Sequence, residues 1–285
     1  MTIRRLRRGL APYPPLLRAI PDPPPVLWLR GDADPELLSA RSVAIVGARA
    51  CSSYGRSVAR ALGRELAAAG LVVVSGMARG IDSEAHRGAL DAGGLTVAVL
   101  GCGIDRDYPA ANRELAARIV ENGLVVSEYE AGIEPAPWRF PARNRIIAGL
   151  CTATVVVEAR ERSGALITAD FALEDGREVM VVPGEITSAV SAGSNALLRL
   201  GATPVTAAAD VLEAYGIQPT VDPVAPLEGL TAALLEKVAE QPASIDELAR
   251  ALAVAPGDVA AALIELELLG RVREGDGVYR ANITR

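Results

Sequence analysis

Residues that bind metals or carry out redox chemistry are scarce in this sequence of 285 residues, which has three cysteines and one histidine. Cys51, Cys102 and Cys151 stand roughly fifty residues apart, so they offer neither metal-ligand spacing nor a disulfide framework. Each lies in or beside an apolar segment, which favours buried packing over catalysis. His86 is the one histidine, so the sequence offers no pair of histidines. We therefore expect no metal site and no histidine-based acid–base catalysis.

Long apolar runs and lysine are also missing. No apolar run reaches the ~18 uncharged residues of a membrane span, and the basic N-terminus lacks the apolar segment of a signal peptide. This pattern predicts a cytoplasmic protein. Lys237 is the one lysine among 29 basic residues, and an arginine excess of this kind is typical of GC-rich coding. The net charge is −6, so any polyanion site has to be a local patch.

What the sequence has is a large apolar fraction, 50%, arranged in short β-branched runs between Ala/Leu/Arg-rich helical stretches. Buried strands separated by helices predict an α/β fold with a doubly wound, mostly parallel sheet. The expected strands cover residues 42–47, 71–75, 96–100, 124–128, 153–158 and 178–183.

Composition divides the chain into four segments. Residues 1–40 are proline-rich and are expected to wrap around the sheet, with Trp28 and Leu29 docked on it. Residues 41–216 form the α/β domain, and residues 217–226 are a Pro/Gly linker. Residues 227–285 read as three helices and a hairpin turning at 275–277, which predicts a winged-helix domain.

The charge of that C-terminal domain disfavours duplex DNA as its partner. From Leu227 onward it has ten acidic residues against six basic ones, and the expected recognition helix, 256–269, contains no arginine. Phosphate contacts need cations on that face. We expect a protein-interaction or structural module instead.

Four glycine-containing loops follow expected strands: residues 47–55, 75–82, 101–109 and 161–170. In a doubly wound sheet these loops meet at the carboxyl edge, where backbone N–H groups at helix starts favour anions. The first loop lacks the glycine spacing of a dinucleotide fingerprint, and there is no P-loop motif, so no cofactor is expected. Asp82 is predicted to be the N-cap of the following helix.

The segment PAPWRFPARNRIIAGL, residues 135–150, places Arg139, Arg143 and Arg145 among Trp138 and Phe140, without an acidic residue. Guanidinium groups that bind phosphates, beside rings that stack on bases, suit single-stranded nucleic acid. The alternative is a helix start with both aromatic side chains in the core and the arginines in solvent. The segment alone favours neither.

Taken in order, these motifs resemble one protein family. The residues are YPPLLRAIPDPPPVLWLRGD, VAIVGAR, SGMARGIDSEAHRGAL, FPARNRIIAGL, SGALITADFALEDGREVMVVPG and AGSNALLRLGA, between about Tyr13 and Tyr215. They closely resemble the DprA/Smf family, the DNA-processing proteins of bacterial natural transformation. The resemblance implies an extended Rossmann-like fold that binds single-stranded DNA, forms a homodimer and helps load the recombinase RecA. It implies no known catalytic turnover. Many family members also carry a helical domain before the segment that starts at Tyr13.

The resemblance also implies a DNA pocket at the family's Gly-Ser/Ala-Arg loop and FPxRNR segment. Ala48 stands where serine is usual, so one hydroxyl donor to phosphate is lost, and a helix-start N–H group can take its place. The residues expected to bind DNA are Gly47, Ala48, Arg49, Arg79, Arg139, Phe140, Arg143, Asn144, Arg145, Ser163, Gly164, Thr168, Gly193, Ser194 and Asn195. Whether Arg143 or Arg145 makes the phosphate contact stays open.

The rival hypothesis is an enzyme. The glycine-rich edge also resembles relatives that cleave the ribose–base bond of nucleoside monophosphates. Those relatives carry a PGGxGTxxE motif, and neither ERSGALITAD nor VVPGEITS fits it. We therefore expect a binding protein without catalytic residues.

Overall fold

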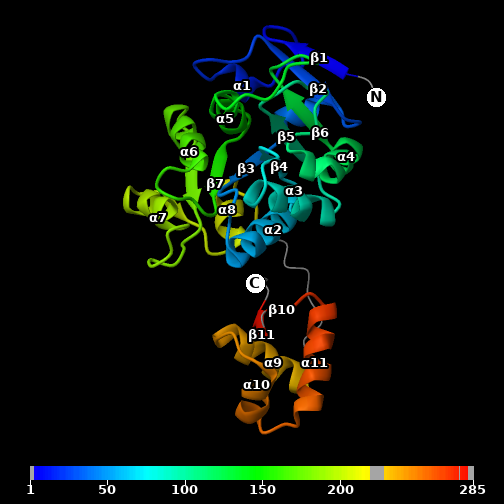
Figure 1. Ribbon diagram of the computed structural model, residues 1–285, viewed down its shortest axis with the longest axis vertical. Coiled ribbons are helices and arrows are strands. Elements are labelled where there is room, and N and C mark those ends of the chain that lie inside the picture. Colours follow the sequence, from blue (N-terminus) through cyan, green and yellow to red (C-terminus); the bar gives the residue numbers. More distant parts are fainter. Residues whose placement is uncertain (1–2, 219–227, 276, 282–285) are drawn as a thin grey trace. The chain divides into compact units, whose positions relative to one another are not determined.

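The computed structural model describes residues 3–218, 228–275 and 277–281 (Figure 1). The chain separates into two compact units, Met1–Pro219 and Thr220–Arg285. The predicted linker, 217–226, falls almost wholly outside the described residues, as does residue 276 in the predicted hairpin turn. No helix in the described ranges is both long enough and apolar enough to cross a membrane.

The first unit is built on one sheet, in which nine strands are described, in the order β1-β2-β6-β5-β4-β3-β7-β8-β9. Neighbouring strands are parallel from β6 to β9, which confirms the predicted mostly parallel sheet. All six predicted strands are present, each within two residues of its expected ends. They are β3 (Ser42–Val46), β4 (Val72–Ser75), β5 (Thr96–Leu100), β6 (Leu124–Ser127), β7 (Ala153–Val156) and β8 (Glu178–Val181); β9 (Thr203–Pro204) follows.

Part of the proline-rich N-terminus joins the sheet instead of only wrapping around it. β1 (Ile3–Arg7) pairs antiparallel with β2 (Val26–Arg30), and β2 pairs antiparallel with β6. The prolines precede β2, where a strand tolerates them, and Leu27 and Leu29 alternate into the core. The short helices α1 (Pro15–Arg18) and η1 (Pro35–Ser39) complete the segment.

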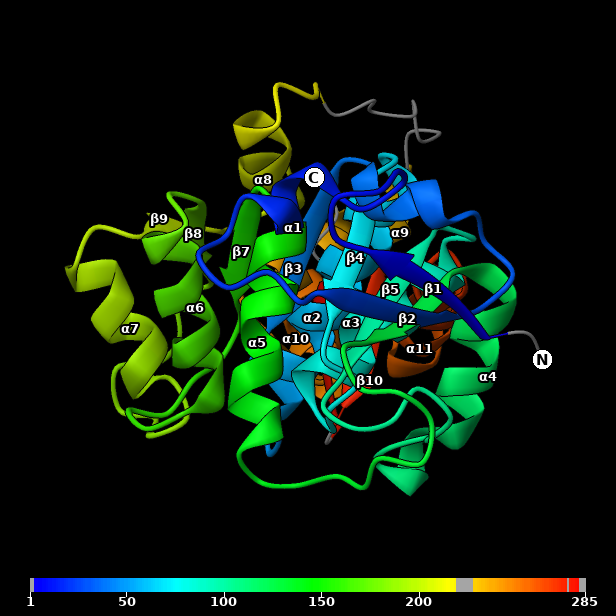
Figure 2. The same ribbon diagram turned by 90° about the horizontal axis from the view of Figure 1, so that it is seen from above.

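Helices cover both faces of the sheet (Figure 2). On one face, α5 (Arg139–Leu150) and α6 (Gly164–Glu174) share an apolar cluster with Ala44 and Val46 of β3. On the other, α3 (Ile81–Asp91) packs between α2 (Ser53–Ala68) and α4 (Arg113–Asn122). The remaining elements of this unit are η2 (Ala110–Asn112), α7 (Ala192–Arg199) and α8 (Ala208–Ala214).

The strand order creates a switch point between β3 and β7. After β3 the chain adds β4, β5 and β6 on one side, and then returns through α5 to add β7 and β8 on the other. Ligands of doubly wound sheets bind outside the carboxyl ends of the strands at such a point. A ligand site is therefore expected at the loops after β3 and β7.

Glycines let the loops at this edge approach one another. A Cβ on Gly80 would lie 2.4 Å from the carbonyl oxygen of Ala48, and Gly80 has φ +80°. A Cβ on Gly76 would lie 2.5 Å from the guanidinium of Arg143. The two glycines after β4 thus make room for the β3–α2 loop and for a side chain of α5.

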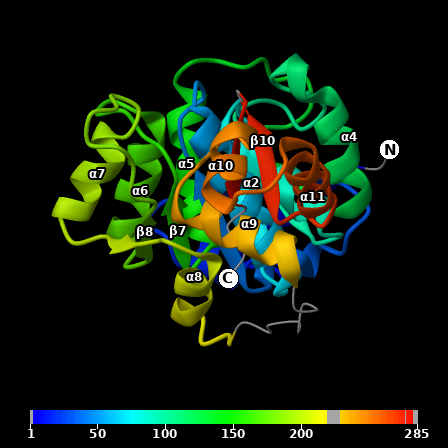
Figure 3. The ribbon, with the colours of Figure 1, turned by 90° about the horizontal axis from the view of Figure 1, so that it is seen from below.

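The second unit has the predicted winged-helix composition: α9 (Gly229–Glu240), α10 (Ile245–Leu252), α11 (Pro256–Leu268), β10 (Val272–Gly275) and β11 (Val278–Ala281) (Figure 3). Ser244 and Pro256 start α10 and α11 as expected, Ser244 through a capping box with Glu247. Leu234, Leu248 and Leu263 lie in its core.

Gly80→Ala is expected to lower the free energy of unfolding by about 3 kcal/mol, because the new Cβ meets Ala48 in a backbone conformation that only glycine adopts easily. Gly93→Ala is the matched control, since Gly93 also has positive φ but a Cβ there meets nothing within 4 Å. It should cost about 1 kcal/mol. Urea denaturation followed by tryptophan fluorescence measures both, because Trp28 and Trp138 lie in the first unit. Equal losses would show that the contact between loops is unimportant.

Candidate nucleic-acid interface

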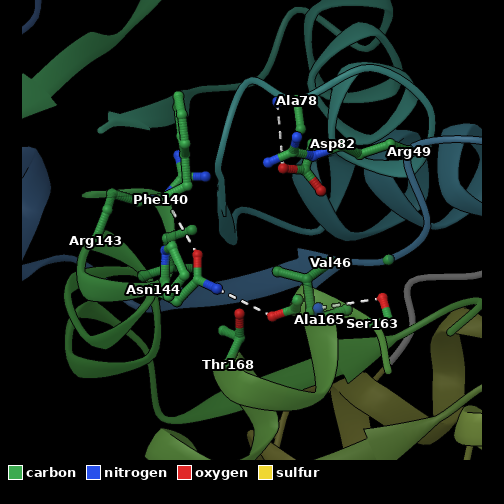
Figure 4. A pocket seen from close by; sticks show the side chains of 14 residues that line it. Val46, Arg49, Ala78, Asp82, Phe140, Arg143, Asn144, Ser163, Ala165 and Thr168 are labelled. Carbon is green, nitrogen blue, oxygen red and sulfur yellow. Dashed lines mark hydrogen bonds between the residues drawn. The ribbon is translucent and has the colours of Figure 1, made fainter. Parts of the chain in front are cut away.

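A cavity of about 240 Å³ opens at the switch point, where the loops after β3, β4 and β7 meet α5 (Figure 4). The β3–α2 loop contributes Gly47 and Arg49, and the β4–α3 segment contributes Ala78 and Asp82. From α5 and the start of α6 come Phe140, Arg143, Asn144, Ile147, Ser163, Gly164 and Thr168. The structure thus brings together three of the four glycine-containing loops with the FPARNR segment.

The spacing along α5 explains which of its residues reach the cavity. Phe140, Arg143, Asn144 and Ile147 follow an i, i+3, i+4, i+7 pattern, which places them on one face of the helix. Arg145 is two positions from Arg143 and therefore points to another side. Its guanidinium pairs with Glu128 at 2.8 Å and Asp22 at 3.0 Å, and its side chain is only 12% exposed. The structure does not bring Arg145 into the cavity.

Arg143 forms the floor of the cavity, with 4% of its surface exposed. Its Nη1 donates to the carbonyl oxygen of Gly76 at 2.6 Å and to that of Val99. Burial lowers the pKa of Arg143 to about 10, while Asp82 opposes that shift. Since this pKa still lies above neutral pH, Arg143 is a fixed positive charge beneath the cavity.

Asp82 is the buried carboxylate facing this charge, and the N-cap prediction for it is wrong. Gly80 occupies the N-cap of α3, and Asp82 lies in the first turn, where its Oδ2 accepts from the N–H of Ala78 at 3.3 Å. Burial raises the pKa of Asp82, and Arg143 lowers it. Asp82 thus balances part of the charge of Arg143.

The α6 side of the cavity is polar and held in place. Asn144 donates through Nδ2 to the carbonyl oxygen of Gly164 at 3.0 Å, which ties α5 to α6 (Figure 4). Ser163 caps α6 by accepting from the N–H of Ala165 at 3.3 Å, and Thr168 is buried one turn later. The polar side chains on this side of the cavity favour a ligand that forms hydrogen bonds.

Arg49 stands at the mouth of the cavity, exposed to solvent, with its guanidinium carbon 5.5 Å from the centre of the Phe140 ring. Phe140 in turn stacks on Tyr108, with ring centres 5.2 Å apart and planes inclined at 27°. Stacked rings beside a guanidinium form a surface on which a nucleobase can stack. Tyr108 lies in the predicted 101–109 loop but was not among the predicted site residues.

A second cavity of about 370 Å³ adjoins the first and shares Arg49, Ala78, Phe140 and Arg143 with it. Arg79, Gly101 and Tyr108 are among its other lining residues. The predicted residue Arg79 is therefore next to the first cavity, not in it. Arg49 and Phe140 therefore line both cavities.

The start of α2, where many related sheets bind phosphate, is occupied by a side chain of this chain. Glu158, buried at the end of β7, accepts from the N–H of Ser52 at 2.9 Å and from the Ser52 hydroxyl. The N–H of Ala48 donates to the Glu158 carbonyl oxygen at 2.7 Å, so it does not replace the missing serine hydroxyl. Glu158 thus fixes the loop that carries Arg49 and keeps a pyrophosphate out of the helix start.

Four other predicted residues lie outside both cavities. Gly193 and Ser194 donate through their N–H groups to the carbonyl oxygen of Ala159, and Asn195 exchanges two hydrogen bonds with Gly184. They hold a loop against the end of β7, and Gly193 borders a separate cavity beside Ser163. Arg139, at the start of α5, packs against Tyr129 and Trp138.

The alternative interpretation of the 135–150 segment is wrong for two of its residues. Trp138 is 62% exposed and Arg143 is buried, the opposite of that interpretation, whereas Phe140 is half-buried and the expected helix start is present at Arg139. His86 is fully buried in α3, with Nδ1 2.7 Å from the Thr96 hydroxyl, and burial lowers its pKa to about 3. A neutral imidazole in the core takes no part in the site.

The lining of the first cavity has few groups that serve in acid–base or nucleophilic chemistry. Of the described residues that line the first cavity, Asp82 is the one carboxylate, and none is a histidine, cysteine or lysine. The Ser163 hydroxyl is used as a helix cap and has no base beside it in that lining. Fixed guanidinium groups, amides and stacked rings suit an anionic ligand that carries aromatic bases.

Arg143→Met is expected to reduce the free energy of unfolding by about 3–5 kcal/mol, because it leaves the carbonyls of Gly76 and Val99 unpaired and the Asp82 carboxylate uncompensated. Arg56→Met, at an exposed position of α2, is the control and should change it by less than about 0.5 kcal/mol. Urea denaturation compares the two. A similar, small effect of both substitutions would contradict the structural role given to Arg143.

Comparison with known proteins identifies relatives over nearly the whole chain. A family model described as DNA recombination-mediator protein A matches residues 6–216, and one described as DprA winged helix domain matches residues 218–277. The DNA processing protein DprA of Streptococcus pneumoniae is 46% identical over 207 residues, 71% of each chain. Protein Smf of Escherichia coli is 37% identical over 279 residues, 94% of this chain and 74% of the relative.

Solved structures agree with this assignment. The X-ray structure of DprA from Streptococcus pneumoniae has a TM-score of 0.71 at 44% identity and covers 74% of each chain. The DNA processing protein A of Helicobacter pylori, whose structure is described for its single-stranded DNA binding mode, has a TM-score of 0.67 at 31% identity. It covers 75% of this chain and 95% of the other. The chain therefore belongs to the DprA/Smf family of DNA recombination mediators.

Proposed function

We propose that this recombination mediator binds single-stranded DNA, without sequence preference, along the two adjoining cavities at the carboxyl edge of its sheet. The observation that carries the proposal is the exposed Arg49 guanidinium over the Phe140 ring, since both residues line both cavities. A guanidinium binds a phosphate while the ring stacks on the adjacent base, and neither contact depends on base identity. The Helicobacter pylori relative, described as binding single-stranded DNA, supports the same ligand.

Within this proposal the predicted DNA-binding residues divide by position. Arg79 contacts DNA in the second cavity. The residues that contact it in the first cavity are Arg49, Phe140, Asn144, Ser163, Gly164 and Thr168. Gly47 makes room for Ile81 and the Glu158 carbonyl oxygen and so shapes the loop that carries Arg49, and Arg143 supplies charge from below. Ala48, Arg145, Gly193, Ser194 and Asn195 act through the scaffold.

Charge at this site is local, because the chain as a whole is anionic. Arg49, Arg79 and Arg143 face the two cavities against the single lining carboxylate of Asp82. A small number of phosphates is therefore neutralised, and the affinity should fall moderately with salt.

The family membership supports a wider role for the same site. We propose that the bound strand is handed to the recombinase RecA, that the chain acts as a homodimer, and that both occur in the cytoplasm during natural transformation. Presenting a strand to a recombinase requires that bases be held without being paired, and an open edge with stacking surfaces suits that task.

The winged-helix unit is proposed to bind protein. Its helix α11 carries Asp258, Glu265 and Glu267 and no basic residue, so it presents no cations to a duplex. An acidic helix face suits a basic surface on a partner protein.

Arg49→Ala is expected to weaken binding of an oligothymidylate at least about tenfold and to reduce the salt slope by about 0.7, because one phosphate contact is lost. Arg41→Ala is the matched control: Arg41 is also exposed but precedes β3, at the opposite edge of the sheet. Fluorescence anisotropy at several salt concentrations measures both variants. Equal affinities for Arg49→Ala and Arg41→Ala would place the DNA elsewhere.

Nucleoside monophosphates incubated with the protein are expected to release no free base, as followed by chromatography. The lining carboxylate Asp82 is buried beside Arg143, and Glu158 is held by Ser52, so neither is poised to assist cleavage. Base release that rises with protein concentration and disappears in Asp82→Asn would favour the enzyme hypothesis instead.

A further inference from the structure

A second group of aromatic and cationic side chains lies where α5 begins, outside both cavities. The Arg139 guanidinium carbon is 4.9 Å from the ring centre of Tyr129 and 4.9 Å from that of Trp138. The two rings meet edge to face, with centres 6.5 Å apart and planes at 86°. Neither cavity includes these three residues, which we call the Trp138 platform.

The geometry points to the Trp138 platform as a second stacking site for the bases of single-stranded DNA, one that lengthens the bound strand beyond the two cavities. This inference rests on the proposed function, because the platform binds the continuation of a strand already held at Arg49. It assigns a DNA contact to Trp138 and Tyr129, which the cavities do not account for.

The Trp138 side chain is exposed and yet held in place. An indole that is 62% exposed leaves a large apolar ring in water, and Trp138 is the most exposed aromatic side chain among the described residues. The ring is nevertheless held in place, because Arg139 contacts it while donating to the carbonyl oxygen of Glu134. A fixed, exposed ring binds a base with little further loss of side-chain entropy.

Charge around the platform favours stacking as the source of its affinity. Glu134 pairs with Arg106 at 2.6 Å, and Glu128 pairs with Arg145 at 2.8 Å, so these two carboxylates are compensated. Glu130, beside Tyr129, is exposed and disfavours a phosphate there, which leaves stacking on the rings as the main contact. Base stacking on aromatic rings tolerates any sequence, as the proposed function requires.

The start of α5 links the Trp138 platform to the cavities. Arg139 of the platform and Phe140 of the cavities are consecutive at the start of α5, and a Cβ on Gly101 would meet both the Phe140 ring and the Arg139 carbonyl. The first turn of α5 contains no acidic residue. A strand that passes from Phe140 to Trp138 thus crosses a helix start free of negative side chains, where a phosphate is favoured.

Fluorescence tests the inference directly, because the chain has two tryptophans, Trp28 and Trp138. In a Trp28→Phe variant all tryptophan emission comes from Trp138. Titration with an oligothymidylate of about 15 nucleotides is expected to quench that emission and to protect it from acrylamide, in step with binding measured by anisotropy. An abasic strand of the same length should bind more weakly and quench little.

Trp138→Ala should weaken binding of the same oligothymidylate about fivefold or more, because one stacked base is lost. Leu95→Ala, which removes an exposed apolar side chain just before β5 at the opposite edge, should leave it unchanged. If DNA binds without changing Trp138 emission, and Trp138→Ala keeps the original affinity, the Trp138 platform does not contact DNA. The cavities would then remain the proposed DNA site. Weaker binding by Arg49→Ala, with full quenching of Trp138 once saturating DNA is reached, supports both. Absence of binding by the unmodified chain would overturn both.

Discussion

The buried guanidinium of Arg143 is the interaction on which the carboxyl edge of the sheet depends. It reaches from α5 to the carbonyls of Gly76, after β4, and Val99, in β5, and so fixes the helix across the ends of two strands. Because Phe140 and Asn144 share a helix face with Arg143, the same contact sets their positions. The shape of the site is therefore fixed before any ligand arrives.

Two further residues, Gly76 and Glu158, keep the loops in place at this edge. Gly76 leaves room for the Arg143 guanidinium, and Glu158 binds the start of α2 through Ser52. Glu158 occupies the start of α2, and the anion position that we propose lies instead at the exposed Arg49. An open edge with an exposed guanidinium suits a polymer that passes across it better than a small nucleotide enclosed in a pocket.

The sequence was sufficient to predict the parallel sheet, the winged helix and the meeting of the loops, because buried strands and glycine turns leave strong local patterns. It did not predict β1 and β2, since the prolines just before residues 26–30 obscure the strand pattern of β2 and β1 lies in the basic N-terminal stretch. The sequence also did not show whether Arg143 or Arg145 makes the phosphate contact. Their spacing shows that they point to different sides of α5, but only the packing of that helix shows which side is the cavity. Tyr108 and the exposure of Trp138 depend on contacts between distant segments, which no local pattern records.

We propose that a DNA strand lies across the Arg49–Phe140 contact at the switch point. In a crystal structure of the chain with a bound oligothymidylate, we expect a phosphate within hydrogen-bond distance of the Arg49 guanidinium and a base against the Phe140–Tyr108 stack. A strand bound instead beside Arg145, or on the winged-helix unit alone, would contradict it.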